Sequence, residues 1–542
     1  MKKRTTWLGA VLVLVFAACS VGPMPVGMDL SNTVLTGQVL QRDASTVTLN
    51  LGELTYQQTP EDAMAAVLTS NLLTADRTSF HTAPNGQTPE SAMRAFVSWK
   101  QDTVLNLSEA KLYTVTDAGQ MEPAQVEDIQ PQDILNVSMG DDNKPAAVVI
   151  LAGAESEIDP EDLQGSAACV VKKYTTNRGE EYISANEDEN ALRVQSASAN
   201  LHNVRVNKTD GESTDETRSN RYGLNAALLA TGGAQVTMTG GAVSSSARSG
   251  CGIFGYGAGT ELHLNNGTIT TTGDNSCGLQ TSGGARIQAR NMTVITSGDS
   301  SAAICADSDG GKIEAEGGTY TSGGYDSPAI YAAGSVEARN AALTANNSAA
   351  VLLEGPNTVS LKNCTVNGSL GTDEEQTPHG AVVFSSVQNA PTQKTAVLNM
   401  ENGSLTARSG DLFYVTGTAC EINLNHVTLT ASEGGTLLRV IGSDTPFGKA
   451  TSVRLNASRQ TLAGNLVVDG ISALQLDLEN GSSLQGAIVR GETPGSSISV
   501  HIAGGCTWSL AGDSQVDTLE NEGTIHYNGY TLTLGDGTVL TA

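Results

Sequence analysis

The sequence has 542 residues and a formal net charge of −27, with 57 acidic against 30 basic side chains. A negative charge of this size repels nucleic acid and anionic lipid headgroups, so neither is an expected partner. Only 4% of the residues are aromatic, whereas glycine occurs 59 times, which favours short strands and turns around an aliphatic interior. The length allows more than one domain.

Residues 1–18 have a basic start followed by twelve mostly apolar residues, too few to span a bilayer, which predicts an export signal. The signal ends at residues 15–19 (Val-Phe-Ala-Ala-Cys), which resemble the lipobox of bacterial lipoproteins, although Phe16 stands where Leu is usual. The resemblance implies that Cys19 carries lipid and that residues 19–31 are a tether. The chain would then be anchored to the cell membrane and face outside. The alternative is a buried or paired Cys19.

Residues 32–153 alternate apolar and polar side chains in short runs, and residues 34–40 and 45–51 read as a hairpin. These strands resemble a small OB-like β-barrel module found near the membrane end of other exported bacterial proteins. Residues 57–101 are predicted to form an inserted arm that is partly helical, because Thr-Pro-Glu occurs twice there as a helix start. Residues 154–186 are predicted to be a linker and a cap.

From residue 187 to 542 the chain repeats one phrase of about 25 residues, in which small polar turns separate three short apolar strands. Ile253, Leu279, Ile304 and Ile330 open successive copies. The strands are rich in β-branched residues and show no helical periodicity, and a fixed repeat of this kind indicates stacked units. The pattern predicts an all-β fold, a right-handed parallel β-helix of about twelve coils, with Trp508 and the last strands closing its end.

The tight turn before the third strand of most copies carries Asn, three residues ahead of an apolar position, with Gly or His in the other copies. Asn and Gly tolerate a left-handed backbone, and stacked amides can hydrogen bond from one coil to the next. A general preference of Asn for loops would not explain why it lies three residues ahead of an apolar position. The predicted ladder consists of Asn203, Asn266, Asn291, Asn340, Asn363, Asn402 and Asn480.

In the later coils, which open at Val351, Val382, Leu412 and Leu437, the first strand is apolar on both faces. A strand with water on one side should alternate, so this sheet is predicted to be covered by the chain's own loops, by the N-terminal module or by a partner. If the sheet is partly open, it is a candidate binding site. That site would consist of Asp373, Glu374, His379, Phe384, Phe413 and Tyr414.

Asp274, Asp299 and Asp326 fall near one corner of neighbouring coils, about 5 Å apart if the coils stack. Carboxylates so placed would attract Ca²⁺, the one cofactor considered, and the alternative is solvated Asp in ordinary turns. Cys251 and Cys277 are one repeat apart and should stack on adjacent coils. They are either thiols that fill space or a disulfide.

Four further stretches are informative, residues 188–194 (DENALRV), 223–230 (GLNAALLA), 327–331 (SPAIY) and 410–415 (GDLFYV). Through these stretches, residues 187–530 look like a family of exported Gram-positive β-helix proteins that are adhesin-like and have a pectin-lyase-like fold. The resemblance implies the fold and a location on the cell surface. The first functional hypothesis is a non-catalytic surface lipoprotein that binds an extracellular glycan or a host or cell-surface protein. One alternative is a polysaccharide lyase or hydrolase, although no paired carboxylates with a neighbouring base are evident in the sequence. A second alternative is a structural envelope protein.

Overall fold

The computed structural model divides into two compact units, the first ending at Leu163 and the second beginning at Gln164, and each is described here by itself. The expected signal, Cys19 and the tether lie outside the residues that the structure describes. No helix among the described residues is long and apolar enough to cross a membrane. The described residues are 34–56, 93–115, 121–131, 133–140, 144–151, 157–158, 163–307, 310–355, 357–369, 380–385, 395–442, 450–491 and 495–541.

The first unit is built on one mixed sheet of eight strands in the order β5-β4-β7-β6-β1-β2-β3-β8, consistent with the small OB-like module that we expected. Its first two strands form the predicted hairpin, in which Val39 lies opposite Leu49 and both side chains are buried. The strands are β1 (Val34–Asp43), β2 (Thr46–Tyr56), β3 (Met93–Asn106), β4 (Lys111–Val115), β5 (Met121–Ala124), β6 (Ile134–Met139), β7 (Pro145–Leu151) and β8 (Glu157–Ile158), with a 3-10 turn η1 (Val126–Asp128).

The boundary of the inserted arm, predicted at 57–101, needs correction. Strand β3 begins at Met93 and pairs with β2 over nearly its whole length, so the last part of that range belongs to the sheet. Alternation was hard to recognise there because residues 98–103 of the sequence are mostly polar. The rest of the arm, including its expected helix starts, lies outside the described residues.

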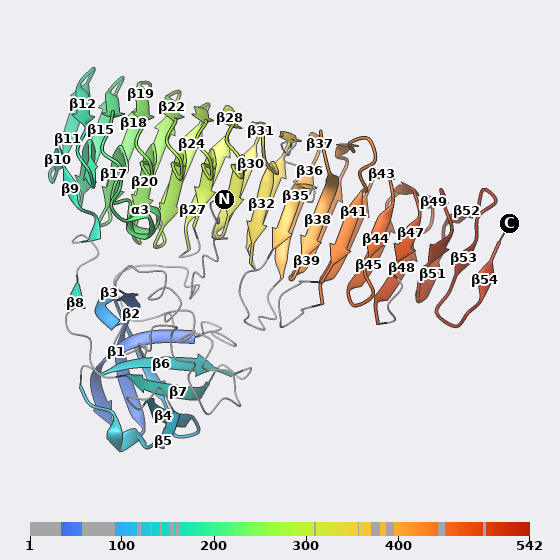
Figure 1. Ribbon diagram of the computed structural model, residues 1–542, viewed down its shortest axis with the longest axis horizontal. Coiled ribbons are helices and arrows are strands. Elements are labelled where there is room, and N and C mark those ends of the chain that lie inside the picture. The colour runs from blue at the N-terminus through green and yellow to red at the C-terminus, as the bar shows by residue number, and fades with distance from the viewer. Residues whose placement is uncertain are drawn as a thin grey trace, which may run out of the picture. The chain divides into compact units, whose positions relative to one another are not determined.

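The second unit is a parallel β-helix, as predicted, and Figure 1 shows its coils stacked side by side from β10 to the C-terminal strands. Each coil contributes one short strand to each of three sheets, which we call S1, S2 and S3. The predicted openings stack in register, since Ile253 pairs with Leu279, Leu279 with Ile304 and Ile304 with Ile330. These aliphatic side chains are completely buried inside the coil and form the core.

Sheet S1 has thirteen strands, and the first strand of each coil lies in it. Its strands are β10 (Val170–Val171), β14 (Leu192–Gln195), β17 (Leu228–Thr231), β20 (Ile253–Tyr256), β23 (Leu279–Ser282), β26 (Ile304–Ala306), β29 (Ile330–Ala332), β32 (Val351–Glu354), β35 (Gly380–Ser385), β38 (Asp411–Thr416), β41 (Leu438–Ile441), β44 (Leu466–Val468) and β47 (Ile488–Arg490).

Sheet S2 has fourteen strands, and polar side chains alternate on its outer face with apolar ones toward the core. Its strands are β11 (Thr175–Arg178), β15 (Ser198–His202), β18 (Gln235–Thr239), β21 (Glu261–Asn265), β24 (Arg286–Arg290), β27 (Lys312–Glu316), β30 (Ser335–Arg339), β33 (Thr358–Lys362), β36 (Ala396–Glu401), β39 (Ala419–Asn425), β42 (Ser452–Ser458), β45 (Ala473–Glu479), β48 (Ser497–Ile502) and β51 (Thr518–Asn521).

Sheet S3 comprises ten strands, and a four-stranded sheet takes its place in the last coils. The ten are β12 (Glu181–Ser184), β16 (Arg205–Lys208), β19 (Ala242–Ser245), β22 (Thr268–Thr271), β25 (Thr293–Thr296), β28 (Thr319–Ser322), β31 (Ala342–Ala345), β34 (Thr365–Gly368), β37 (Ser404–Ala407) and β40 (Thr428–Thr430). The four are β43 (Thr461–Ala463), β46 (Ser483–Gln485), β49 (Thr507–Ser509) and β52 (Thr524–His526).

The first complete coil begins earlier than residue 187, because β10, β11 and β12 already occupy the three sheets within the predicted linker and cap. A two-stranded pairing of β9 (Ser166–Ala167) with β13 (Glu189–Asn190) lies at this end. The buried Arg193 donates hydrogen bonds to three successive backbone carbonyls from Gln164 to Ser166. Burial lowers the pKa of Lys208 to about 8, and its ammonium donates to the Glu189 carbonyl at 2.9 Å.

The other end is closed by a short sheet of β50 (Ser514–Gln515), β53 (Leu532–Thr533) and β54 (Val539–Leu540), whose last two strands are antiparallel. Trp508 was expected to close this end. It lies instead completely buried within the coil, and its indole N–H donates to the Gly486 carbonyl at 3.0 Å. A parallel stack cannot continue past an antiparallel pair, so the hairpin rather than the indole ends the solenoid.

Candidate functional site

The predicted binding residues do not form one surface in the structure. Asp373, Glu374 and His379 lie outside the described residues. Phe384 and Phe413 have 0% exposure and belong to the core cluster, so neither ring can contact a ligand. Tyr414 faces outward but is only 7% exposed.

The position of Phe413 follows from a register that the sequence did not reveal. Val382 pairs with Phe413, and Phe413 pairs with Leu438, so the inward positions lie one residue after the predicted openings Leu412 and Leu437. A shift of one residue in a strand exchanges its two faces. Because these strands are apolar on both faces, hydrophobicity could not fix the register.

The apolar outer face of S1 is buried, as its sequence predicted. Ala349, Val383 and Tyr414 form a separate hydrophobic cluster there, and the partly buried Leu352 and Ile441 pack against it. Tyr414 lies between Val383 and Arg439 on neighbouring strands. This face therefore offers packing and no open site among the described residues.

The three aspartates considered for Ca²⁺ do not converge. Asp274 and Asp299 are already occupied, because each carboxylate accepts a backbone N–H from the next coil, at 2.9 and 2.8 Å. Asp326 occupies the neighbouring left-handed position (φ 49°) that Asn275 and Ser300 hold in the preceding coils. Burial and the nearby Asp299 raise the pKa of Asp326, which further disfavours its charged form. Among the described residues no group of three acidic, His or Cys side chains could hold a metal ion.

The left-handed backbone turn of the predicted Asn ladder is present at all seven positions. Among the described residues, hydrogen bonds between these Asn side chains run through only part of the ladder, from Asn340 to Asn402. All seven predicted Asn residues have φ between 50° and 55°, and Gly240, Gly317 and His426 share this left-handed conformation. Asn363 donates to the Asn340 amide oxygen at 3.0 Å, and Asn402 donates to that of Asn363 at 3.2 Å. A side chain at Gly240 would place its Cβ only 2.2 Å from the Asn203 amide oxygen, so glycine interrupts the ladder there.

A second line of amides, which the sequence analysis did not identify, runs along the outer face of S2. Asn399 donates to the Ser360 hydroxyl at 3.2 Å, Asn423 donates to Asn399 at 2.9 Å, and Asn456 donates to Asn423 at 2.7 Å. The four residues pair directly on successive strands. Their signal was an Asn between two apolar residues in three successive copies, such as Leu398-Asn399-Met400.

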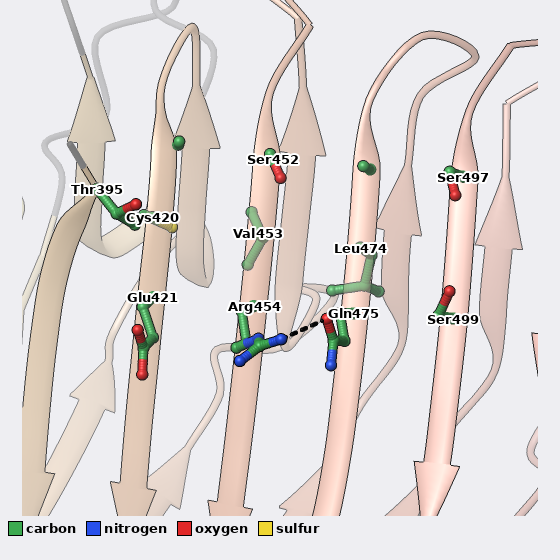
Figure 2. Close-up of a pocket in the computed structure, with 12 residues that line it drawn as sticks. Thr395, Cys420, Glu421, Ser452, Val453, Arg454, Leu474, Gln475, Ser497 and Ser499 are labelled. Carbon is green, nitrogen blue, oxygen red and sulfur yellow. Dashed lines mark hydrogen bonds between the residues drawn. The ribbon is translucent and has the colours of Figure 1, made fainter. Parts of the chain in front are cut away.

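Beside this line, the outer face of S2 is hollowed across β39, β42, β45 and β48, with a volume of about 460 Å³. Figure 2 shows Glu421, Arg454, Gln475 and Ser499 in one row across these four strands. Arg454 donates to the Gln475 amide oxygen at 2.9 Å, and the dashed line in Figure 2 marks this bond. Each of the four is opposite the next in the strand register.

The amide line and the hollow are connected by hydrogen bonds. Asn456 donates to Glu421 at 3.1 Å, and Gln475 donates to Asp477 at 3.0 Å. Asp477 follows Asn456 in the amide column, and His501 follows Asp477. The result is a polar surface with donors and acceptors at fixed spacing, and the hollow itself is lined by no aromatic ring.

A second hollow of about 330 Å³ lies on the earlier S2 strands β24, β27 and β30. It is lined by charged side chains, including Arg290, Glu314, Glu337 and Arg339. Burial alone would raise the pKa of Glu314, but hydrogen bonds from Arg286, Lys312 and Gln288 lower it to about 2. Arg339 likewise pairs with Glu337. Several of these charges are therefore paired with one another, whereas the hollow at β39–β48 combines amide, hydroxyl and charged side chains.

No known protein-family model matches the chain, and no curated protein sequence is significantly similar to it. These comparisons assign no activity to the protein.

Proposed function

We propose that the protein is a non-catalytic surface lipoprotein whose β-helix binds an extended glycan along the outer face of S2. The observation that carries this proposal is the open hollow at β39–β48, lined by Glu421, Arg454, Gln475 and Ser499 and continued by the amide line. Side chains of this kind recognise hydroxyl groups, because amides, guanidinium and carboxylate together supply both donors and acceptors.

The repeat of the solenoid suits a polymer better than a compact ligand. Neighbouring strands are about 4.8 Å apart, so equivalent polar groups recur at that interval along the stack. An extended sugar chain that runs along the stack would therefore meet a polar side chain on each coil it crosses, such as Arg454, Gln475 and Ser499 in turn. The surface is shallow and polar, so we expect the affinity to come from several sugar residues rather than from one buried ring.

Display outside the cell remains part of the proposal through Cys19 as the lipid-modified residue and through the resemblance to exported adhesin-like proteins. A host or cell-surface protein that carries such glycans would then be the natural partner. Polysaccharide cleavage is the alternative, and a structural role in the envelope is the second.

The proposal is tested by binding to a glycan array with product analysis in parallel. We expect Arg454→Ala combined with Gln475→Ala to weaken binding about tenfold or more, since a hydrogen bond to a charged group contributes about 1.5–3 kcal/mol. Lys362→Ala is the matched control, because it removes one cation from the same face, where Lys362 pairs with Glu401 rather than lining the hollow.

Equal loss of binding in both variants would show that net charge, not the hollow, determines binding, and would overturn the assignment of the site. Release of unsaturated oligosaccharides would support the enzyme, and absence of any binding would support the structural role. A Cys19→Ala variant that is still labelled by fatty acid would refute the anchor independently of the glycan result.

A further inference from the structure

Three cysteines gather on one side of the solenoid under the short helix α3 (Glu216–Tyr222). Cys251 and Cys277 precede β20 and β23, and Cys305 lies within β26. All three are buried and free. Their neighbourhood is not part of the proposed glycan site, which lies on S2.

The three thiols are in mutual contact through Cys277. Cys277 is close enough to both Cys251 and Cys305 for each of these side chains to shift its pKa. Cys251 and Cys277 occupy equivalent positions on adjacent coils, because the Gly252 N–H donates to the Cys277 carbonyl at 2.9 Å and the strands that follow are in register. Adjacent strands lie about 4.8 Å apart, within the range of Cα separations that a disulfide spans.

Helix α3 is connected to this cluster. The Cys251 thiol donates to the Gln280 side-chain oxygen at 2.7 Å, and the Gln280 amide donates to the Asn220 carbonyl at the end of the helix, also at 2.7 Å. Gln280 in turn pairs with Cys305 on the next strand. Oxidation of Cys251 would therefore remove a donor from the side chain that holds α3 to the sheet.

The central position of Cys277 makes it the nucleophile of the cluster. The neighbouring side chains of Cys251 and then Cys305 lower the pKa of Cys277. The neighbouring Cys277 side chain, followed by burial, raises the pKa of Cys251 and of Cys305. This direction favours the thiolate at Cys277, and the thiolate is the reactive form of cysteine.

We propose that Cys251 and Cys277 are a redox pair that forms a disulfide between adjacent coils, with Cys305 as the positioning thiol. The oxidant is a small-molecule disulfide. The Cys277 thiolate attacks one of its sulfurs, a mixed disulfide forms and one small thiolate leaves. The Cys251 thiolate then attacks the Cys277 sulfur, the protein disulfide forms and the second small thiolate leaves. Two protein thiols are oxidised and one small disulfide is reduced to two thiols.

The other described cysteines lack such a partner thiol. Cys364 donates to the backbone carbonyls of Ala338 and Lys362, and burial raises the pKa of Cys364 and of Cys420. Cys169 is the one described cysteine that is partly exposed, and it provides an internal reference for oxidant access.

The experiment maps disulfides by mass spectrometry after the full-length protein has been incubated with oxidised glutathione, acid-quenched, unfolded and alkylated. We expect a cross-linked peptide pair containing Cys251 and Cys277, a loss of two hydrogens, and alkylated Cys305. Cys251→Ser should instead trap glutathione on Cys277, and Cys305→Ser should slow the reaction several-fold. Cys364→Ser is the matched control and should leave both the product and its rate unchanged.

The pair would be overturned if Cys251 and Cys277 were both fully alkylated under conditions in which Cys169 had formed a glutathione adduct. Cross-links that join other cysteines, with Cys251 and Cys277 free, would also overturn it. Because the wild-type map and the Cys251→Ser adduct each decide the question, the test does not depend on the folding of a Cys277 variant.

Discussion

The two corners on either side of sheet S3 connect neighbouring coils through side chains of very different burial. At the corner between S2 and S3, Asn363 and its neighbours in the ladder lie at the surface and bond amide to amide. At the corner after S3, Ser276, Ser301 and Ser327 have 0% exposure. Each serine hydroxyl accepts a backbone N–H from the preceding coil at 2.9 Å and donates to a carbonyl of that coil.

The difference explains which corner tolerates other residues. At the exposed corner Gly240, Gly317, His426 and Arg459 all replace Asn while keeping a positive φ, because water can satisfy the groups that an amide would bond. At the buried corner water is absent, so a missing hydroxyl leaves backbone groups without partners. At the exposed corner, the left-handed backbone conformation therefore limits which residues fit. At the buried corner, the need for a hydrogen-bonding side chain limits them.

The largest effect is expected from Ser301→Ala. The substitution removes the acceptor of the Ser276 N–H and a donor to the Gly273 carbonyl, both in a buried corner. We expect a loss of about 2 kcal/mol in the free energy of unfolding, the usual cost of leaving a buried polar group without its partner. Urea denaturation measures it as a lower midpoint.

Thr293→Ala is the control for this prediction, because Thr293 points outward from the same coil and should change stability by less than about 0.5 kcal/mol. Equal losses of unfolding free energy in the two variants would mean that the buried serines stabilise the fold no more than an outward side chain does. The proposed difference between the two corners would then be wrong.

Much of the fold could be predicted because the solenoid repeats its core positions. Ile253, Leu279, Ile304 and Ile330 recur at intervals of 25 or 26 residues, and each is an inward residue of S1. The strands β10 to β12 were predicted only as part of a cap and not as a complete coil, since they are short and carry few apolar residues. The repeat therefore locates the regular coils, but it does not locate the irregular ends of the solenoid.

The site residues were harder to predict, because a binding site depends on whether each side chain lies on the inner or the outer face of its strand. Phe413 was expected on a surface and lies in the core, since apolar residues on both faces hid the register. Cys305 falls at a different place in its copy from Cys251 and Cys277, so repeat spacing alone could not bring it to them. The amide column of Asn399 and Asn423 was visible in the sequence as a recurring polar residue within apolar strands.

A smaller effect is expected at the exposed corner, where Asn363 has φ 54°. Asn363→Ala should cost about 1–2 kcal/mol, because a residue with a Cβ is strained in the left-handed region. Asn363→Gly restores the conformation and loses only the exposed amide bonds, so its cost should be a few tenths of a kcal/mol. If glycine proved as costly as alanine in urea denaturation, the amide bonds would matter more than the backbone.

The smallest effect is expected from the charged side chains on the outer face of S2, which also connect one coil to the next. Glu314 bonds to Arg286 on the neighbouring strand at 2.6 Å and to Lys312 on its own strand at 2.7 Å. Although burial raises its pKa, these bonds lower it from 4.5 to about 2. A carboxylate with a lowered pKa in the folded state adds stability above its unfolded pKa and loses it on acidification.

The free energy of unfolding of the wild type should therefore exceed that of Glu314→Gln by about 0.5 kcal/mol at neutral pH. The value is kept small because Arg286 and Glu314 are both partly exposed and their Coulomb energy is screened. The difference should shrink as the pH falls from about 4.5 to about 2, where Glu314 becomes protonated in the folded protein. Added salt should reduce it at neutral pH, since ion pairs near the surface are screened. A difference that is independent of both pH and salt would assign the effect to side-chain packing, and the charged face would then contribute to cohesion in the same way as the buried serines.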